Sequence, residues 1–414
     1  MNRLILIGNG FDLAHNLKTG YKDFINWYWT KWYEKLRSSE KSYEDDELCS
    51  FKLKLQHILW YIHLSQHIDL SERQLSGIEF INQIINESPE TYELIKCPLL
   101  ENITQSIETK GWVDIENEYY HLLTEYTKET YQEEDVKKLN KQLEFLRKRL
   151  IEYLKEINSE DKKCYDNIAE KIYAPFNQQD FSLLGVKCLD EHRKTVIQQD
   201  EVEWEDKLLS YGLKEIHFRF IIKKAKAIKA EPNSNYNDDD QYLLMLPDEI
   251  MMLSFNYTNT LDGYKEECST INYIHGELEE PESVIFGYGD ELDESYNHIK
   301  RLNNNELLSN FKSSKYLESD RYRKLLQFIE SAPFQVYIMG HSCGNSDRTL
   351  LNTIFEHDNC VSIKPYYYEQ GNGKDNYLDI IHNISRNFTD MKKMRDRVVN
   401  KTYCEPLVRT KGKK

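Results

Sequence analysis

The spacing of hydrophobic residues divides this chain into three stretches with different expected structures. Residues 3–7 form a short run rich in leucine and isoleucine, and a glycine turn follows at once, which is typical of a buried parallel strand entering a ligand loop. From about residue 20 to 245 the spacing is helical. Short strand-like runs return between about 250 and 370, and helical runs lie between some of them, which predicts a mostly parallel α/β sheet.

The third stretch supplies most strands of this predicted sheet. Its strand-like runs are residues 250–255, 271–274, 284–286, 334–339 and 360–365. Helices are expected around 319–330 and 347–357. With residues 3–7 as the first strand, the predicted fold class is α/β, a mostly parallel sheet interrupted after its first strand by a large all-helical insertion.

One long helix is predicted inside the insertion, because leucines recur there three or four positions apart. The apolar stripe consists of Leu139, Leu143, Leu146, Leu150, Leu154 and Ile157. It indicates either packing within a helical domain or a short coiled coil with a partner, and we favour packing. The 16 glycines and 9 prolines are few for 414 residues, which also favours long helices.

Domain boundaries follow from these differences in residue spacing along the chain. A polar and acidic run at residues 233–240, flanked by prolines, marks the end of the insertion. The expected division is a core of residues 1–20 and 246–390, a helical insertion of residues 21–245, and a basic C-terminal tail of residues 391–414. The insertion is the expected contact surface for a homo-oligomer or a partner protein.

The charge balance limits the classes of partner. The chain carries a net charge of −16, which excludes general electrostatic adhesion to nucleic acid or anionic membranes as the main activity. Residues 391–414 hold nine basic and two acidic side chains, a net charge of +7, so the rest carries −23. We expect this tail to be solvated and consider nucleic-acid binding the less favoured interpretation.

The sequence predicts a cytoplasmic protein without a metal. Its apolar N-terminal run is too short for a signal peptide, and no apolar stretch approaches the ~20 residues of a membrane helix. The eight cysteines include no Cys-x-x-Cys pair, so neither a disulfide framework nor a zinc site is expected. His63 and His67 are spaced as a ligand pair on a helix, but the glutamate of the His-Glu-x-x-His motif is absent.

The first candidate site is the loop after the first predicted strand, made of Gly8, Asn9, Gly10, Phe11 and Asp12. Two glycines at this spacing let backbone N–H groups approach a phosphate, with a helix N-terminus behind them. The third glycine of the dinucleotide fingerprint is replaced by Leu13, and a tight structural turn is an equally good interpretation. The Asp12 carboxylate would repel phosphate but suits a ribose hydroxyl.

Two further candidates follow other predicted strands. Asn256, with Thr258 two residues on, can orient a water or a sugar hydroxyl, or it can simply form an Asn/Thr turn. His275 stands before a glycine, and a neutral histidine there suits a general base. Open α/β sheets bind ligands at the carboxyl ends of their strands. Together, these positions therefore indicate a ligand site more strongly than either does alone.

The fourth candidate is the run Met339–Asp347, which contains Gly340, His341 and Ser342. The letters Gly-His-Ser-Cys-Gly match a nucleophile elbow, and a serine hydrolase would then use Asp358 or Asp379 with His382. However, the next helix is expected to begin at Ser346 or Asp347 rather than at the serine. We therefore favour a second glycine-rich nucleotide loop.

The segment Trp112-Val113-Asp114-Ile115-Glu116 places two carboxylates two positions apart, so on a helix they would not share a face. They would either reach the site from the insertion or solvate the first turn of a helix.

Taken together, these motifs resemble the bacterial abortive-infection AbiH family of phage-defence proteins. The resemblance rests on Leu4–His15, Trp112–Glu116, Phe255–Thr258, Ile274–Gly276 and Gly340–Ser342, and it spans essentially the whole chain. More distantly, the set is similar to sirtuin-like NAD-binding domains with a Rossmann-like fold. Those domains carry Gly-Ala-Gly, Asn-x-Asp, His-Gly and a late Gly-x-Ser.

The sirtuin-like resemblance implies NAD as substrate or ligand, with no metal. It implies catalytic roles for Asn256 and His275 on the ribosyl–nicotinamide bond. It implies nucleotide binding by Gly8, Asn9, Gly10, Phe11, Asp12, Thr258, Gly340, His341 and Ser342. This chain has Thr258 where sirtuin-like proteins usually have aspartate, and Asp12 where they usually have serine, and it lacks the zinc cysteines of deacylases.

The expected activity is therefore NAD glycohydrolysis in anti-phage defence, started by a phage-derived trigger. The alternatives are a nucleotide-binding sensor that contacts a partner protein without turnover, and a serine hydrolase at Ser342.

Overall fold

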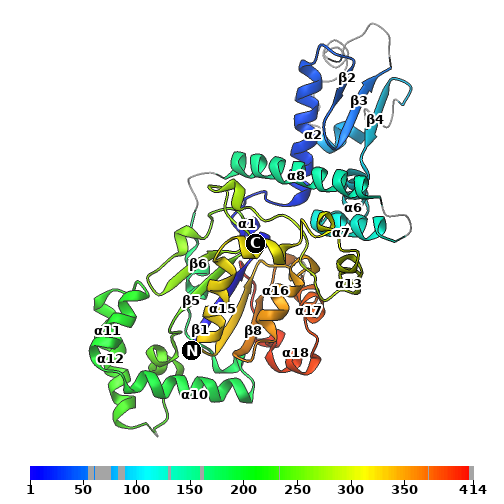
Figure 1. Cartoon of the computed structure of the whole chain (residues 1–414). Coiled ribbons are helices and arrows are strands. Elements are labelled where there is room, and N and C mark those ends of the chain that lie inside the picture. The colour runs from blue at the N-terminus through cyan, green and yellow to red at the C-terminus, as the bar shows by residue number, and fades with distance from the viewer. Residues whose placement is uncertain are drawn as a thin grey trace. The chain divides into compact units, whose positions relative to one another are not determined.

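The computed structural model describes residues 1–54, 60, 76–82, 89–128, 132–158, 163–232, 234–371 and 373–409. The chain forms two compact units, which we describe separately (Figure 1). Unit 1 consists of Met1–Leu17, Ser159–Ile285 and Ser313–Lys414, and unit 2 consists of Lys18–Asn158 and Phe286–Lys312. Residues 163–245, which the sequence placed in the insertion, thus belong to the same unit as the first strand.

The centre of unit 1 is a five-stranded, wholly parallel sheet (Figure 1). Its strands are β1 (Asn2–Ile7), β5 (Ile250–Ser254), β6 (Ser269–Tyr273), β7 (Phe334–Met339) and β8 (Cys360–Tyr366). They lie in the order β6-β5-β1-β7-β8. In chain order the sheet therefore runs 3-2-1-4-5, and its direction of growth reverses between β1 and β7.

Both faces of this sheet are buried by helices, because successive side chains of a strand point to opposite faces. Leu4 and Leu6 belong to one hydrophobic cluster, and Ile5 and Ile7 belong to another. The first cluster contains residues of α15 (Arg321–Ser331), α16 (Arg348–Phe355), α17 (Tyr377–Arg386) and α18 (Met391–Arg397). The second contains residues of α9 (Asp166–Ile172), α10 (Leu183–Gln198), α11 (Glu201–Ser210) and α12 (Glu215–Ala230).

The second cluster explains why the predicted insertion was too long. The face of β1 that carries Ile5 and Ile7 needs a covering layer, and the helices between residues 163 and 246 provide it. The acidic run before residue 246 is likewise no simple linker. Its described part leads into a 3₁₀ helix, Asp238–Met245, whose Leu243 and Leu244 are buried in the same cluster.

Unit 2 contains a three-stranded antiparallel sheet, so the prediction of an all-helical insertion was wrong. Its strands are β2 (Tyr43–Asp45), β3 (Cys49–Leu53) and β4 (Tyr92–Lys96), in the order β2-β3-β4. In β3, Cys49, Phe51 and Leu53 are buried and alternate with more exposed residues, which is the period of a strand. Each strand is at most five residues long, too short to stand out from its helical surroundings.

The helices of unit 2 include the long one predicted from its leucine spacing. They are α2 (Tyr21–Ser38), α5 (Gly77–Phe80), α6 (Pro98–Lys110), α7 (Ile115–Tyr126), α8 (Glu133–Ile157) and α13 (Glu294–Arg301). The stripe of α8 is buried from Leu139 to Leu154 within unit 2, so it packs inside its own domain. None of the helices in the described part of the chain combines the length and apolar character needed to cross a membrane.

One predicted strand, residues 284–286, is absent from the structure. Residues 284–286 follow a 3₁₀ turn at Pro281–Ser283 and form no strand, although Val284 and Phe286 are buried. The Ile285 N–H donates to the carbonyl oxygen of His275 instead of joining a sheet. Burial of apolar residues in an extended loop therefore produced a strand-like pattern.

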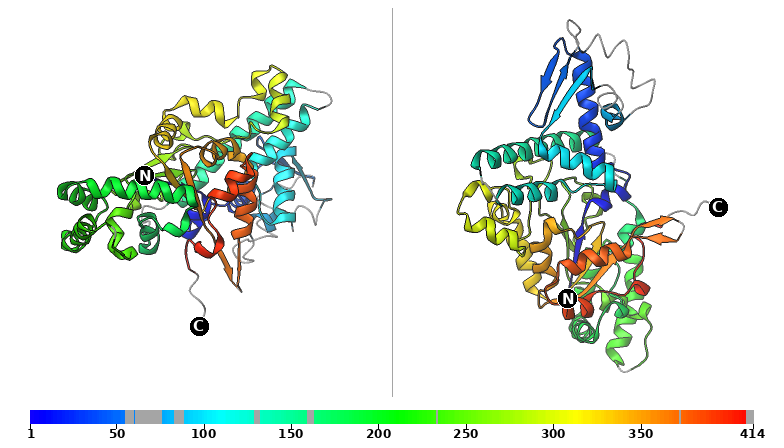
Figure 2. Two further views of the ribbon diagram at one scale, coloured as in Figure 1. Left: turned by 90° about the horizontal axis from the view of Figure 1, so that it is seen from below. Right: turned by 90° about the vertical axis from the view of Figure 1, so that its right-hand side faces the viewer.

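The described part of the C-terminal stretch, residues 391–409, is anchored to unit 1 by a few buried residues, while many of its side chains are exposed. Met394 of α18 and Leu407 are buried, and the Val399 N–H donates to the Ile363 carbonyl beside β8. The short hairpin of β9 (Glu369–Gly371) and β10 (Lys374–Asp375) extends away from the sheet in the right-hand view of Figure 2. Residues 410–414 of the predicted tail lie outside the described residues.

The two carboxylates of the Trp112–Glu116 segment have different roles in unit 2. Asp114 caps α7 by accepting the Asn117 N–H at 3.1 Å. Glu116 is buried and accepts hydrogen bonds from the Lys312 ammonium at 3.1 Å and from the Gly287 N–H at 2.9 Å. The second carboxylate therefore ties residues 286–312 to α7, a role that neither sequence interpretation included.

Replacing Lys312 with methionine should lower the free energy of unfolding of unit 2 by about 3 kcal/mol, because Glu116 would stay buried without its cation. Hydrogen exchange of α7 peptides in denaturant measures this loss. Lys137→Met removes a solvent-exposed partner of Glu133 in the same unit and should change that exchange little. Equal exchange in the two variants would contradict the prediction.

Candidate functional site

The four candidate motifs of the sequence all follow strands of the parallel sheet in unit 1. Gly8 comes directly after β1, Asn256 shortly after β5, His275 shortly after β6, and Gly340 directly after β7. Because these strands are parallel, the four motifs lie at the same carboxyl edge. The loops after β1 and β7 adjoin the point where the strand order reverses, which is where open α/β sheets bind ligands.

The two glycine loops pack directly on one another. The Gly10 N–H donates to the Gly340 carbonyl at 2.8 Å, and the Gly8 N–H donates to Met339 at 3.3 Å. Gly340 has a φ of +78°, and a Cβ atom built on it would fall on the backbone nitrogen of Phe11. Only glycine therefore permits this close approach.

This packing uses the amides that the sequence assigned to phosphate. Besides Gly8 and Gly10, the Phe11 N–H donates to the Gly8 carbonyl at 2.8 Å as the helix α1 (Asn9–Ala14) begins. The glycine spacing thus has the structural role that was the alternative to a phosphate loop. Phosphate binding by these residues stays a prediction.

Asn256 joins the loop after β5 to the loop after β1. Its Nδ2 atom donates to the Gly8 carbonyl at 3.0 Å, and its backbone N–H donates to the Ser254 hydroxyl at 3.2 Å. The side chain is half-buried. With Nδ2 engaged by the protein, Oδ1 is the amide atom that can accept a hydrogen bond from a ribose hydroxyl or a water.

Asp12 and Thr258, the two positions that depart from the sirtuin-like pattern, contact each other. The Thr258 hydroxyl donates to Asp12 Oδ2 at 2.6 Å and accepts from the Thr260 hydroxyl at 3.2 Å. Asp12 and Thr258 are almost fully buried. The acid and the hydroxyl thus stand on the opposite loops from those expected in the sirtuin-like pattern.

Thr258→Val should lower the stability of unit 1 by about 1–3 kcal/mol, because the Asp12 carboxylate loses a buried hydrogen-bond donor while side-chain shape is kept. Thr258→Ser retains the hydroxyl and serves as the matched control. A thermal melt followed by hydrogen exchange of β1 and β5 peptides measures both variants. A valine variant no less stable than the serine variant would contradict this expectation.

A buried carboxylate connects two histidines from different strand ends. Asp347 Oδ1 lies 3.3 Å from His275 Nε2, and Asp347 Oδ2 lies 3.5 Å from His341 Nε2. The Phe255 ring packs against both imidazoles, with centroid distances of 5.2 Å to His275 and 4.0 Å to His341. The Tyr316 hydroxyl is 3.1 Å from His275 Nε2.

Asp347, Phe255 and Tyr316 were not among the individual site residues predicted from the sequence, although Asp347 ends the fourth candidate run and Phe255 begins the motif Phe255–Thr258. The sequence predicted the next helix to begin at Ser346 or Asp347, and α16 does follow Asp347, but the Asp347 carboxylate makes no capping hydrogen bond. The sequence feature that could have identified Asp347 as a site residue was its position, because it ends the same run that contains Gly340 and His341. Tyr316 carried no comparable signal, since it lies in an irregular segment 41 residues beyond His275.

The structure gives the serine hydrolase little support. Ser342 is exposed, and among the described residues its hydroxyl has no histidine partner. The positive φ values fall at Gly340 and Cys343 rather than at the serine, and α16 begins only at Arg348. Burial raises the pKa of the Cys343 thiol well above its usual range, so that thiol is no alternative nucleophile.

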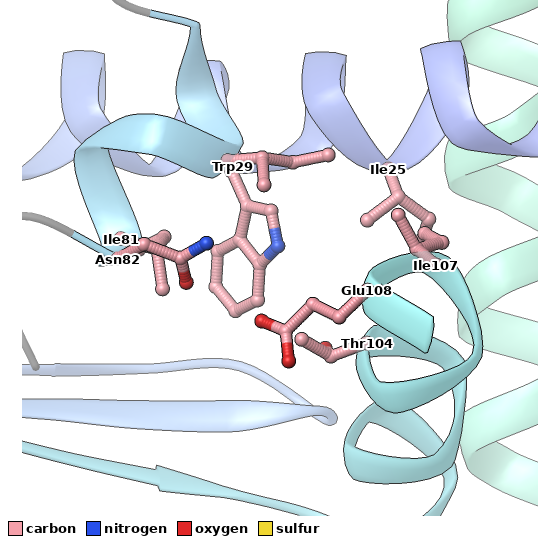
Figure 3. Close-up of a pocket in the computed structure, with 8 residues that line it drawn as sticks. Ile25, Trp29, Ile81, Asn82, Thr104, Ile107 and Glu108 are labelled. Atoms are coloured by element: carbon pink, nitrogen blue, oxygen red, sulfur yellow. The ribbon is translucent and has the colours of Figure 1, made fainter. Parts of the chain in front are cut away.

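A small, mainly apolar pocket is found in unit 2, and none of the predicted site residues lines it. Figure 3 shows the Trp29 indole at its centre, with Asn82 on one side and Ile107 on the other. Among the residues that the structure describes, no group of histidine, cysteine and acidic side chains is arranged to hold a metal ion. His63 and His67 lie outside the described residues.

The chain matches the family described as "Bacteriophage abortive infection AbiH" over residues 4–368, and it belongs to that family. The resemblance seen in the motifs is therefore confirmed, and with it a role in abortive infection, a defence against bacteriophages. No curated protein and no solved structure matches the chain.

Proposed function

We propose that this protein binds NAD or a related nucleotide at the carboxyl edge of its parallel sheet and hydrolyses the nicotinamide–ribose bond during abortive infection. The observation that carries the proposal is the gathering of Asn256, His275 and two glycine loops at one edge. The 3-2-1-4-5 strand order is that of Rossmann-like dinucleotide-binding sheets, which supports a nucleotide as the ligand.

The pairing of Asp12 with Thr258 supports the more distant sirtuin-like relationship. Each residue alone departs from that pattern, but the two departures compensate because the acid and the hydroxyl have exchanged loops. An acid and a hydroxyl group are therefore both present next to the candidate asparagine, Asn256, as the sirtuin-like pattern would require. The departures do not argue against a nucleotide-cleaving site.

The proposed reaction needs few groups from the protein. The C–N bond breaks with its electron pair leaving on nicotinamide, which departs as a neutral molecule, and an oxocarbenium-like ribose remains. Water adds to the ribosyl carbon and gives its proton to His275, so the products are nicotinamide, ADP-ribose and a proton. Asn256 Oδ1 would orient the ribose hydroxyls or the water, contributing through position rather than covalent chemistry.

The test is to incubate pure protein with NAD, with and without lysate of phage-infected cells, and to measure free nicotinamide. We expect release that requires both Asn256 and His275. No release under any of these conditions would overturn hydrolysis.

A second candidate function, nucleotide sensing without turnover, is favoured by one observation. The amides of Gly8, Gly10 and Phe11 donate to carbonyls of the protein itself, and His275 is only 4% exposed. This closed arrangement suits a binding protein that holds its ligand without reacting. It predicts nucleotide recovered from denatured, freshly purified protein, together with unchanged NAD in infected cells.

A further inference from the structure

Helices α11 and α12 of unit 1 leave large apolar side chains exposed. The two helices pack against one another and lie side by side at the lower left of Figure 1. Their exposed apolar residues, each between 48% and 80% exposed, are Val202, Leu209, Ile216 and Phe220. A surface helix normally carries polar residues on the face that points away from the core. One exposed apolar residue needs no explanation, but several on two neighbouring helices indicate a contact surface.

On each helix, the exposed apolar residues share one face with two charged residues. The face of α11 consists of Val202, Glu205, Asp206 and Leu209. The face of α12 has the same spacing and consists of Ile216, Arg219, Phe220 and Lys223. All of these residues are exposed. Because residues three, four and seven positions apart lie on one side of a helix, each set forms a single stripe.

Both stripes point away from the same core. The opposite side of α11 carries Trp204 and Leu208, and the opposite side of α12 carries Phe218 and Ile222. These four side chains are buried in one hydrophobic cluster. The two stripes therefore lie next to each other on the outer side of the helix pair. We call the two stripes together the α11–α12 face.

The charges of this face have opposite signs on its two helices. Both charged residues of the α11 stripe are acidic, and both of the α12 stripe are basic. Within the part of the chain that the structure describes, none of the four has an ion-pair partner. Charges of the same helices that lie off the stripes are paired: Lys226 contacts Glu201, and Lys224 contacts Asp240 at 2.8 Å. The unpaired charges thus coincide with the exposed apolar residues.

This charge pattern favours a second copy of the chain as the partner. Nucleic acid or an anionic membrane would be repelled by the acidic stripe. A fitting partner needs an apolar surface with a basic side for α11 and an acidic side for α12. A second copy, turned about a two-fold axis parallel to the helices, offers this pattern because α11 of each copy then lies on α12 of the other.

We infer that the α11–α12 face is the interface of a symmetric homodimer. Glu205 and Asp206 of one copy face Arg219 and Lys223 of the other, and the apolar residues of both copies are enclosed between them. This interface does not depend on the proposed nucleotide chemistry. It also differs from the contact surface expected from the sequence, which was the whole predicted insertion, because both helices belong to unit 1.

Two charge-reversal variants of the full chain test the interface. Arg219→Glu with Lys223→Glu makes both stripes acidic, and Glu205→Lys with Asp206→Lys makes both basic. Each variant alone places like charges opposite one another, so its dimer should be at least about 100-fold weaker than that of the wild-type protein. When the two variants are mixed in equal amounts, every contact joins opposite charges again. We therefore expect the mixture to form a dimer containing one copy of each.

The matched control reverses two exposed charges elsewhere in unit 1. Lys392→Glu with Arg395→Glu on α18 makes the same change in net charge as the acidic variant and should dimerise like the wild-type protein. Sedimentation equilibrium from micromolar to near-millimolar protein measures all of these states, and circular dichroism establishes that each variant is folded.

A dimer of the wild-type protein and the control, loss of it in each charge-reversal variant, and its recovery in the mixture would support the inference. A wild-type protein that stays monomeric over this concentration range overturns it. A dimer that neither charge-reversal variant weakens overturns it as well, since the contact would then lie on another surface. Loss of the dimer in both variants without recovery on mixing would contradict the placement of α11 on α12.

Discussion

Replacing Gly340 with alanine should lower the free energy of unfolding of unit 1 by about 3–5 kcal/mol. An L-residue in the left-handed region costs roughly 1–2 kcal/mol by itself. The remainder comes from the new Cβ atom, which would overlap the backbone of Gly10 and Phe11 and force the loop after β1 away from the loop after β7. We expect the largest stability loss at this position because both loops belong to the central strands.

A glycine elsewhere in unit 1 separates backbone strain from steric overlap. Gly371 has a φ of +84°, close to that of Gly340, but a Cβ atom there meets nothing within 4 Å. Gly371→Ala should therefore show the backbone cost alone. Hydrogen exchange of β1 and β7 peptides across a urea series gives both values. Similar losses in the two variants would show that the contact between the glycine loops contributes little.

Asn256→Ala and His275→Ala should each lower kcat for NAD cleavage by about 10²–10⁴-fold. The stability cost of the asparagine change should be only about 1 kcal/mol, since one half-buried hydrogen bond to Gly8 is lost. The rate loss thus exceeds anything that reduced folding explains. Nicotinamide release at saturating NAD, measured on protein whose folded fraction is checked by hydrogen exchange, gives these values.

The matched control is His382→Ala, which removes an exposed histidine of α17 in the same unit. It should leave the rate unchanged, whereas a serine hydrolase using His382 would lose its activity. If the Asn256 and His275 variants cleaved NAD as fast as this control, the assignment of both catalytic residues would be wrong.

The central strands could be predicted from sequence because both faces of a parallel sheet are buried. Residues 334–339 were predicted as a strand and form β7 with the same bounds, and residues 3–7 extend by one residue to form β1. Such strands are continuous apolar runs, so each can be predicted from its own residues without knowing which strands lie beside it. The location of the candidate site at the carboxyl edge could be predicted as well, because each motif stands at the end of a predicted strand.

The elements that the sequence did not predict depend on long-range contacts. Strand β3 owes its burial to neighbours in unit 2 rather than to a long local pattern, and residues 284–286 are buried without pairing in a sheet. Asp347 is separated from His275 by 72 positions, so only the fold brings them together. Local patterns report burial and spacing, but not which side chains will meet.

The most direct test of the account is the structure of the protein with a non-hydrolysable carbocyclic analogue of NAD. We predict the analogue at the carboxyl edge of the sheet, with its nicotinamide-bearing ring in hydrogen-bond reach of Asn256 Oδ1 and close to His275. The diphosphate should lie by the loops that contain Gly8 and Gly340. An analogue bound elsewhere on the protein, or no binding at millimolar concentration, would contradict the assignment of this edge as a nucleotide site.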